Sequence, residues 1–233
     1  MAKHIGIVAC SAEGAALCYR TICREAGSEM AEHDHPEITM HTHPLAEYLI
    51  GIRHGDWDLV AQLMLSSTYI VAEAGAKFAI SPDNTIHAAF DRVILESPIP
   101  WIHIADAVGA EARRKGVKHL GVLGTKYLMT GPVYPEALQK LGMTCEIPDG
   151  EDRERINDII FKELVNGIFP ERSRLYFNEV IAKLKDRGCE AVILGCTEIP
   201  LIVDPSDCPL PTLDSTRLLA RSALRRALGK TLQ

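Results

Sequence analysis

Two stretches of this 233-residue chain recur about half a chain later. The segment from His4 to Cys10 resembles the segment from His119 to Thr125, at an offset of about 115 residues. The segment from Gly75 to Asn84 matches the segment from Gly188 to Thr197 at nearly the same offset. Because the two offsets agree so closely, they indicate one duplicated structural unit.

Tyr19 and Tyr134 extend the first pair of segments, since each follows its segment at the same distance. The alternative explanation is chance, because any two strand-loop-helix units look alike in short windows. We expect a duplication, and therefore two related lobes.

Each repeated segment is a short, continuously apolar stretch followed by a small polar loop and an amphipathic stretch. This is the pattern of buried parallel strands joined by helical crossovers. It predicts an α/β fold with two pseudo-symmetric lobes, each a mainly parallel sheet flanked by helices. The expected helices are 12–25, 57–74, 104–115, 152–166, 172–187 and 215–228. Gly75, Gly116 and Gly188 stand where C-terminal helix caps belong.

The expected first lobe comprises residues 1–99 with 208–233, and the second comprises residues 100–207. Ligands of parallel α/β sheets collect at the carboxyl ends of the strands, where loops and helix N-termini converge. We therefore expect the active site in the cleft between the lobes. Lobe closure would use hinges near residues 98–101 and 204–211.

Composition favours an ordinary globular protein that binds a small molecule. Apolar residues make up 47% and charged residues 24% of the chain, and a net charge of −6 gives no basic surface for nucleic acid. The seven cysteines form no C-x-x-C pair, which favours reduced thiols over disulfides or a zinc site. No signal peptide or membrane span is expected, so we predict a cytoplasmic protein.

The duplication puts Asp83 and Cys196 at corresponding positions, after equivalent strands. Two groups related in this way suit a two-base racemisation, in which one removes a proton from a stereocentre and the other returns a proton to the opposite face. A thiolate suits this task when helix N-termini or nearby donors lower its pKa. A purely structural reading makes Cys196 a buried thiol and Asp83 a turn residue that fixes its loop.

The stretch from Ala191 to Leu201 resembles the second cysteine motif of the aspartate/glutamate racemases. The resemblance covers nearly the whole chain, including 83–87, 100–104 and 213–216. It implies a two-domain, often dimeric enzyme with its active site between the domains and with neither pyridoxal phosphate nor metal. It also implies that the C-terminal helix returns to the first domain, and that Cys196 is catalytic.

Three departures from the family pattern bear on the chemistry. Asp83 stands where the family's first motif carries its other cysteine, so the opposing base is not a thiol at this position. The family often has a histidine a few residues after the motif that matches Asp214-Ser215-Thr216, whereas this chain continues with Arg217. Asn166 stands where many members carry a basic residue. The two lost cations weaken the case for aspartate itself as substrate, because its side-chain carboxylate needs a cationic partner.

The remaining candidate site residues are polar side chains in the same loops. Loop residues at helix starts can hold a substrate carboxylate through hydroxyl, amide and backbone N–H groups, or can simply cap the helices. The substrate-binding candidates are Ser11, Ser81, Asn84, Thr85, Thr125, Thr197 and Glu198. His41 and His43 share a face of a probable strand, but without a second cluster we predict no metal site.

Three functions remain open at this point. The first is a cofactor-independent amino-acid racemase, a homodimer that uses Cys196 and Asp83. The second is a single-cysteine isomerase, lyase or decarboxylase acting on a small carboxylate. The third is a carboxylate-binding protein without turnover.

Overall fold

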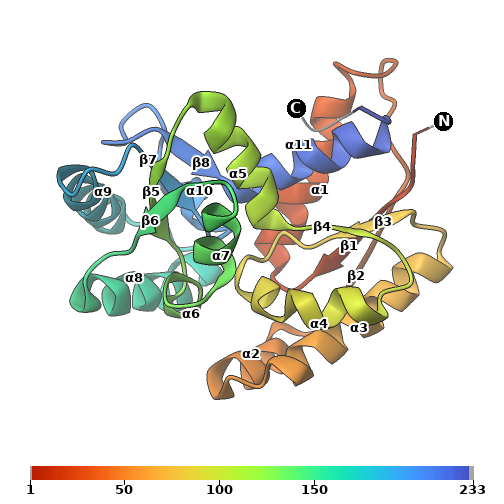
Figure 1. Cartoon of the computed structure of the whole chain (residues 1–233), viewed down its shortest axis with the longest axis horizontal. Coiled ribbons are helices and arrows are strands. Elements are labelled where there is room, and N and C mark those ends of the chain that lie inside the picture. Colours follow the sequence, from red (N-terminus) through yellow and green to blue (C-terminus); the bar gives the residue numbers. More distant parts are fainter. Residues whose placement is uncertain (1, 231–233) are drawn as a thin grey trace. The chain divides into compact units, whose positions relative to one another are not determined.

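The computed structural model describes residues 2–230 and contains two compact units. The first unit runs to Ala107 and resumes at Thr216, and the second is Val108–Ser215. Each unit contains one four-stranded sheet in which every described pairing is parallel. Helices flank both sheets (Figure 1). The predicted α/β class with two related sheets is confirmed.

The sheet of the first unit has the strand order β2-β1-β3-β4. Figure 1 shows α1 and α11 on one of its faces and α2, α3 and α4 on the other. The elements of this unit are β1 (Ile5–Ala9), α1 (Ala12–Ala26), β2 (Ile38–Thr42), α2 (Leu45–His54), α3 (Trp57–Glu73), β3 (Phe78–Ile80), the 3-10 helix η1 (Thr85–Ala89), α4 (Phe90–Glu96) and β4 (Trp101–Ile102).

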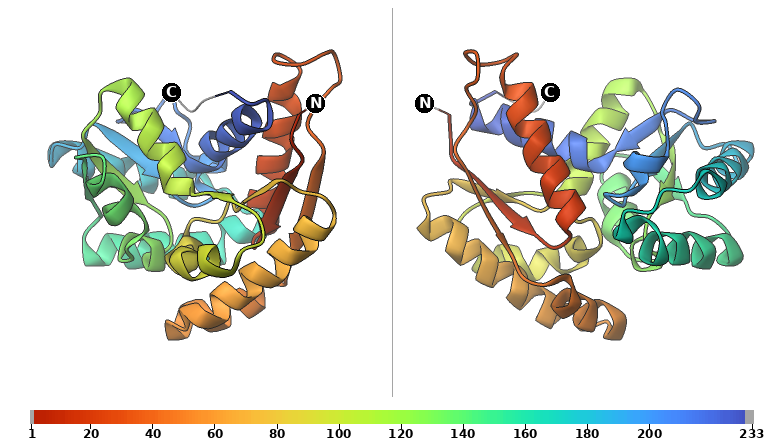
Figure 2. Two further views of the ribbon diagram at one scale, coloured as in Figure 1. Left: turned by 45° about the vertical axis from the view of Figure 1, so that its right-hand side comes forward. Right: turned by 180° about the vertical axis from the view of Figure 1, so that it is seen from behind.

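The last helix, α11 (Ser215–Ala227), belongs to the core of the first unit except for its opening residue. Leu219 and Ala223 are buried with Ile5 and Ile7 of β1 in one apolar cluster. At the surface, the Arg221 guanidinium of α11 donates to the Glu25 carboxylate of α1 at 2.8–3.0 Å. The Lys3 N–H also donates to the Ala227 carbonyl at 2.8 Å, and both views in Figure 2 show α11 beside α1.

The sheet of the second unit has the equivalent order β6-β5-β7-β8. Side chains from α8, α9 and α10 cover it in a second apolar cluster. Its elements are β5 (His119–Leu123), α6 (Lys126–Met129), α7 (Val133–Gln139), β6 (Thr144–Glu146), α8 (Gly150–Lys162), η2 (Leu164–Asn166), α9 (Glu171–Asp186), β7 (Ala191–Leu194), α10 (Ile199–Ile202) and β8 (Thr212–Asp214).

The repeated sequence corresponds to repeated packing. β1 and β5 occupy the same place in their sheets, and each contains one glycine, Gly6 or Gly121. A Cβ at Gly6 would lie 2.7 Å from Val71 of α3, and one at Gly121 would lie 2.8 Å from Leu184 of α9. Each glycine therefore allows close packing of a helix on the strand: α3, which precedes β3, in the first unit, and α9, which precedes β7, in the second. The tyrosine pair does not extend the likeness, since Tyr19 is exposed and Tyr134 is buried.

The boundaries between the two units lie at Ala107/Val108 and Ser215/Thr216, not near residues 99 and 208 as expected from the sequence. Residues 100–107 belong to the first unit because β4 pairs with β3, and residues 208–215 belong to the second because β8 pairs with β7. The chain passes from one unit to the other within α5 (Ile104–Lys115) and at the start of α11. The segments near 98–101 and 204–211, where we expected hinges, each lie inside one unit.

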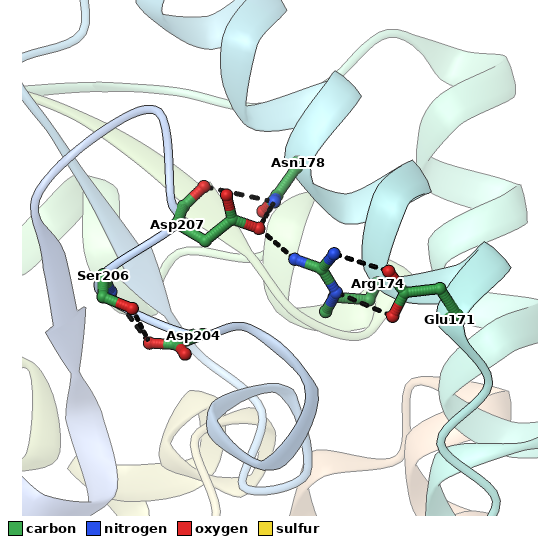
Figure 3. A network of polar contacts seen from close by, with 6 residues as sticks. All are labelled: Glu171, Arg174, Asn178, Asp204, Ser206 and Asp207. Atoms are coloured by element: carbon green, nitrogen blue, oxygen red, sulfur yellow. Dashed lines mark hydrogen bonds and ion pairs between the residues drawn. The ribbon is translucent and has the colours of Figure 1, made fainter.

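A polar network holds the loop after α10 to α9 within the second unit (Figure 3). The Arg174 guanidinium donates to the Glu171 carboxylate at 2.5 Å and 2.9 Å, and also to Asp207. Asn178 Nδ2 donates to the Asp207 backbone and side chain at 3.3 Å. The Asp204 carboxylate accepts from Ser206 at 2.8 Å. Asp207 is therefore bonded to α9, and Asp204 to the turn that precedes Asp207.

Most predicted helices are confirmed within about three residues, a normal uncertainty at helix ends. The exception is 152–166, where the α-helix ends at Lys162 and the turn from Leu164 is a 3-10 helix. Gly75, Gly116 and Gly188 have positive φ, as helix-ending glycines do. Helix α2 was not predicted. Within residues 2–230, no helix is both long and apolar enough to cross a membrane.

Candidate functional site

Cys196 lies two residues past the end of β7, at the carboxyl edge of the second sheet. The Gly195 N–H donates to the Leu123 carbonyl at 2.7 Å, which joins the ends of β7 and β5. A Cβ at Gly195 would meet the Leu123 carbonyl at 2.8 Å and the Leu128 side chain at 2.5 Å. Only glycine fits here, so the Gly-Cys pair places the thiol just beyond the edge of the sheet.

The Cys196 thiol donates to Glu198 Oε2 at 2.9 Å, and the Thr197 hydroxyl donates to the same oxygen at 2.7 Å. Glu198 is only 2% exposed and Thr197 is buried, while Cys196 is partly exposed. Three consecutive residues thus form a hydrogen-bonded group in which the thiol of Cys196 and the hydroxyl of Thr197 share one buried carboxyl oxygen of Glu198. Glu198, which we predicted as a substrate-binding residue, is oriented toward the thiol.

Other side chains complete this edge of the second unit. The Thr125 hydroxyl accepts from the Leu128 N–H at 3.2 Å, so it caps α6 after β5. The Ser215 hydroxyl donates to the Leu194 carbonyl at 2.8 Å, at the end of β7. Burial raises the pKa of Tyr134, so this phenol stays protonated. The strand ends β5, β7 and β8 therefore converge on the Cys196 loop.

Asp83 lies at the corresponding edge of the first sheet. Its Oδ2 accepts from the Ser11 N–H at 3.0 Å, across the ends of β1 and β3. Its own N–H donates to the Ser81 hydroxyl at 3.4 Å. The buried Cys10 directly precedes Ser11, whose N–H is the donor to Asp83. A buried thiol therefore lies one residue along the chain from the group that binds the partly exposed Asp83 carboxyl.

Asn84 and Thr85 begin the 3-10 helix η1 directly after Asp83, as expected for helix-start residues. The buried His87 holds this loop in place, because its Nε2 bonds the Ser81 carbonyl at 3.1 Å. Burial lowers the pKa of His87 well below its usual value, and nearby His103 lowers it further. A neutral His87 therefore donates its Nε2 proton to the Ser81 carbonyl.

The carboxyl edges of the two sheets each carry a partly exposed ionisable residue, a thiol in one unit and a carboxyl group in the other. In the second unit a partly exposed thiol, Cys196, stands in front of a buried carboxylate, Glu198. In the first unit the partly exposed carboxyl group of Asp83 binds the N–H of Ser11, the residue after the buried thiol of Cys10. Each unit therefore has one partly exposed ionisable group at the carboxyl edge of its sheet.

The predicted site residues thus gather in two groups, one per unit. Ser11, Ser81, Asp83, Asn84 and Thr85 belong to the first unit, and Thr125, Cys196, Thr197 and Glu198 belong to the second. Asn166 has a structural role, since its amide donates to the Phe161 and Lys162 carbonyls at the end of α8.

The histidines near residue 40 bond to α3 rather than to each other. His41 bonds Ser67 at 3.0 Å and His43 bonds Ser66 at 3.2 Å. Across residues 2–230, no group of three or more His, Cys, Asp or Glu side chains is arranged to hold a metal ion.

Two residues of the first unit were missed from the sequence, Cys10 and Tyr48; the charges of Cys10 and Asp83 both raise the pKa of the buried Tyr48 phenol, after burial itself. Cys10 is the last residue of the first repeated segment and aligns with Thr125 in the second, but the sequence pattern indicated no role for it. Tyr48 lies in α2, whose ends carry usable signals: Pro44 precedes the helix, and Gly55 follows it in the left-handed conformation.

Known proteins resemble this chain over nearly its full length. The Asp/Glu/hydantoin racemase family matches residues 5–223. The broad specificity amino-acid racemase RacX of Bacillus subtilis (strain 168) is 20% identical over 207 residues, 89% of this chain and 88% of that protein. Glutamate racemase from Listeria innocua is 29% identical over 150 residues, 63% of this chain and 54% of that enzyme.

Solved structures agree with these matches. A Yersinia pestis protein assigned as an Asp/Glu racemase has a TM-score of 0.88 at 33% identity, over 97% of this chain and 99% of that one. An aspartate racemase homologue from Pyrococcus horikoshii OT3 has a TM-score of 0.84 at 28% identity, over 98% and 100% of the two chains. The family match and these two structures cover both units, so the chain belongs to the Asp/Glu/hydantoin racemase family of isomerases.

Proposed function

We propose that this protein is a cofactor-independent racemase of an amino acid of the aspartate/glutamate type, with Cys196 as one acid/base and Asp83 as the other. The observation that carries the proposal is the contact of the partly exposed Cys196 thiol with the buried Glu198 carboxylate at 2.9 Å. A structural thiol has no need of a buried ionisable partner, whereas an acid/base thiol benefits from a fixed orientation and a controlled charge.

Racemisation by this route needs only proton transfers. One group accepts the Cα proton, the electron pair of the broken C–H bond moves into the adjacent carboxylate, and the other group donates a proton to the opposite face of Cα. Cys196 serves as thiolate in one direction and as thiol in the other. Asp83 does the converse, and its carboxylate is stabilised by the Ser11 N–H at 3.0 Å.

Substrate binding falls to the polar groups around these two residues. Loop hydroxyls, amides and backbone N–H groups at helix starts can hold a carboxylate. We propose this role for Ser11, Ser81, Asn84, Thr85, Thr125 and Thr197. Glu198 acts instead on Cys196. The names of the relatives, a broad specificity amino-acid racemase and glutamate racemases, agree with an amino-acid substrate.

A second candidate is a single-cysteine isomerase or lyase on a small carboxylate. It is favoured by one observation: a carboxyl group, Asp83, stands where the duplication would put a partner thiol for Cys196. A carboxylate is a much weaker base than a thiolate. Chemistry from one face of the substrate needs Cys196 alone.

Proton-to-deuterium exchange at Cα distinguishes these functions. We would incubate the protein in D₂O with both enantiomers of a panel of amino acids and with dicarboxylates, and follow the Cα proton by NMR. A racemase exchanges and interconverts both enantiomers. A one-base enzyme exchanges one form without inversion, and absence of exchange across the panel would contradict both enzymes and leave a carboxylate-binding protein.

A cytoplasmic homodimer is part of the same proposal. Tyr69 and Ile70 on α3, with Ile94 and Leu95 on α4, are exposed large apolar side chains on two packed helices. Such exposed apolar side chains are typical of a subunit interface. Light scattering during size-exclusion chromatography would measure the mass, and Leu95→Glu should halve it if this interface exists.

A further inference from the structure

His41 and His43 form a contacting pair at the carboxyl end of β2, an edge strand of the first sheet. They stand two residues apart on an extended segment, so their side chains lie on the same face. Their ring centres are 5.0 Å apart, and the ring planes make an angle of 80°. Both side chains are partly exposed, so the pair can be reached from solvent.

Each ring of the pair is held by one serine of α3. His41 Nδ1 bonds the Ser67 hydroxyl at 3.0 Å, and His43 Nε2 bonds the Ser66 hydroxyl at 3.2 Å. Among residues 2–230, no hydrogen-bond partner is identified for the other two ring nitrogens, His41 Nε2 and His43 Nδ1. Because neither of them is a buried unpaired atom, both are open to solvent.

The separation of the rings fits two imidazoles bound to one metal ion. A transition metal binds an imidazole nitrogen at about 2.0–2.1 Å, and the ring centre lies roughly 1.1 Å beyond that nitrogen. For ligand angles between about 90° and 109°, these lengths put two ring centres about 4.5–5.3 Å apart. The observed 5.0 Å lies within this range. The same distance also suits an edge-to-face contact of two rings, so an experiment has to separate the two explanations.

The two serines provide the outer contacts that a metal-binding histidine needs. Such a histidine usually donates its second ring N–H to a fixed acceptor, which sets the tautomer and orients the ring. Ser67 is 0% exposed and lies within the 17-residue helix α3, which packs against β2. When His41 Nδ1–H and His43 Nε2–H donate to the serine hydroxyls, the lone pairs of His41 Nε2 and His43 Nδ1 are available to a metal.

We propose that His41 and His43 chelate one divalent transition-metal ion of the class of Zn²⁺, Ni²⁺ and Cu²⁺, through His41 Nε2 and His43 Nδ1, with water completing the coordination. These ions favour imidazole nitrogen, whereas Mg²⁺ and Ca²⁺ favour oxygen. The sequence led us to expect no metal site because it shows no second ligand cluster. The structure adds the ring spacing and the two orienting serines, and two protein ligands suffice for an exchangeable ion. The racemisation proposed for Cys196 and Asp83 does not use this ion.

Isothermal titration calorimetry of the untagged full chain with NiCl₂ tests the proposal. We expect one site in the wild type, and affinity at least about tenfold lower in His41→Ala and in His43→Ala, because each loses the chelate. Ser66→Ala should weaken binding by about tenfold through the lost outer contact. The matched control carries His33→Ala and His35→Ala, since these histidines have the same spacing but His33 lies in a turn with positive φ. It should bind Ni²⁺ as the wild type does.

NMR of the wild type provides a second test that does not depend on the stability of any variant. Substoichiometric Ni²⁺, which is paramagnetic, should broaden the ring signals of His41 and His43 before those of the other histidines. Absence of binding at millimolar Ni²⁺ would overturn the proposal and leave the pair as an ordinary ring contact. Equal affinity in the wild type and in the variant lacking both His41 and His43 would also overturn it, as would earlier broadening of other histidines. No substrate is involved, so these outcomes are independent of the proposed racemase.

Discussion

The Cys196 sulfur lies 2.9 Å from Glu198 Oε2, and that carboxylate is buried. A negative charge in such a position acts strongly on its neighbours, because little water is present to screen it. In the proposed function Glu198 acts on the ionisation of the thiol, and Thr197 fixes the carboxylate with a 2.7 Å hydrogen bond.

Glu198→Gln tests this relationship. The variant removes the charge and keeps an oxygen that accepts from Thr197, so the thiolate is no longer opposed by a nearby carboxylate. We expect Cys196 to react with iodoacetamide about tenfold faster at pH 7. Cys196→Ala supplies the background from the other cysteines. A slower reaction would instead make Glu198 the base that takes the thiol proton.

Cys196→Ala should lower Cα exchange by about 1,000-fold or more, as expected when an acid/base group is lost. The melting temperature should change little, because Cys196 is partly exposed and the lost volume is small. Cys189→Ala is the matched control: it removes a buried thiol of the same unit and should cost some stability with no loss of exchange. Near-native exchange in a folded Cys196→Ala protein would exclude the mechanism.

Asp83→Asn should give a directional defect. If Asp83 is the second base, the variant stops racemisation of both enantiomers but leaves Cys196 able to exchange the one enantiomer it deprotonates. If Asp83 only fixes its loop, Asn should preserve most activity, because it is as good a cap as Asp. Separate exchange measurements from the L and D forms distinguish these outcomes.

Asp83→Cys is the complementary variant. It restores a thiol at the position equivalent to Cys196, and a thiolate returns the proton more readily than a carboxylate does. Racemisation should therefore be faster than in the wild type. A slower variant would indicate that the first-unit edge, with its neighbouring Cys10, requires a carboxyl group at this position.

His87 should make the protein sensitive to acid. Burial lowers its pKa in the folded state, so below about pH 6.5 the unfolded chain binds a proton that the folded chain does not. The contribution of His87 to the free energy of unfolding is fully present above that pH. It falls by about 1.4 kcal/mol per pH unit as the pH decreases toward the folded-state pKa. His87→Gln can still donate to the Ser81 carbonyl, and its urea unfolding between pH 8 and 5 should depend less on pH. Parallel curves would contradict this assignment.

Gly6→Ala and Gly121→Ala should each destabilise the protein by about 1–3 kcal/mol, because the new Cβ overpacks against Val71 or Leu184. Gly27→Ala is the control, since Gly27 has φ −60° and its nearest neighbour would lie 3.9 Å away. It should be neutral or slightly stabilising. Urea unfolding measures all three, and a similar loss in each would remove the special role of the two strand glycines.

The repeat was predictable because it rests on local signals. Apolar strands, capping glycines and amphipathic helices are visible in the sequence, and all six proposed helices are present in the structure. The unit boundaries were not predictable in the same way. β4 has only two residues, Trp101 and Ile102, and its sheet is decided by the pairing of Ala79 with Trp101, which no local pattern encodes.

The site was predictable where a motif carried it and not where side chains from distant segments meet. Asp83 and Cys196 follow from the duplication, whereas Tyr48 depends on the unpredicted α2. That helix contains Gly51, which is unfavourable within a helix but fits this position, because a Cβ there would lie 2.8 Å from the Val60 side chain. Packing against α3 therefore outweighs the propensity of the segment.

The return of α11 to the first sheet has a consequence for synthesis on the ribosome. Leu219 and Ala223 belong to the cluster that contains Ile5 and Ile7, so the core around β1 is incomplete until α11 has been made. The second unit, Val108–Ser215, is continuous and is complete before α11 emerges. Nascent chains should therefore acquire protease resistance in the second unit first, with the strands of the first unit protected only after α11 has left the ribosome.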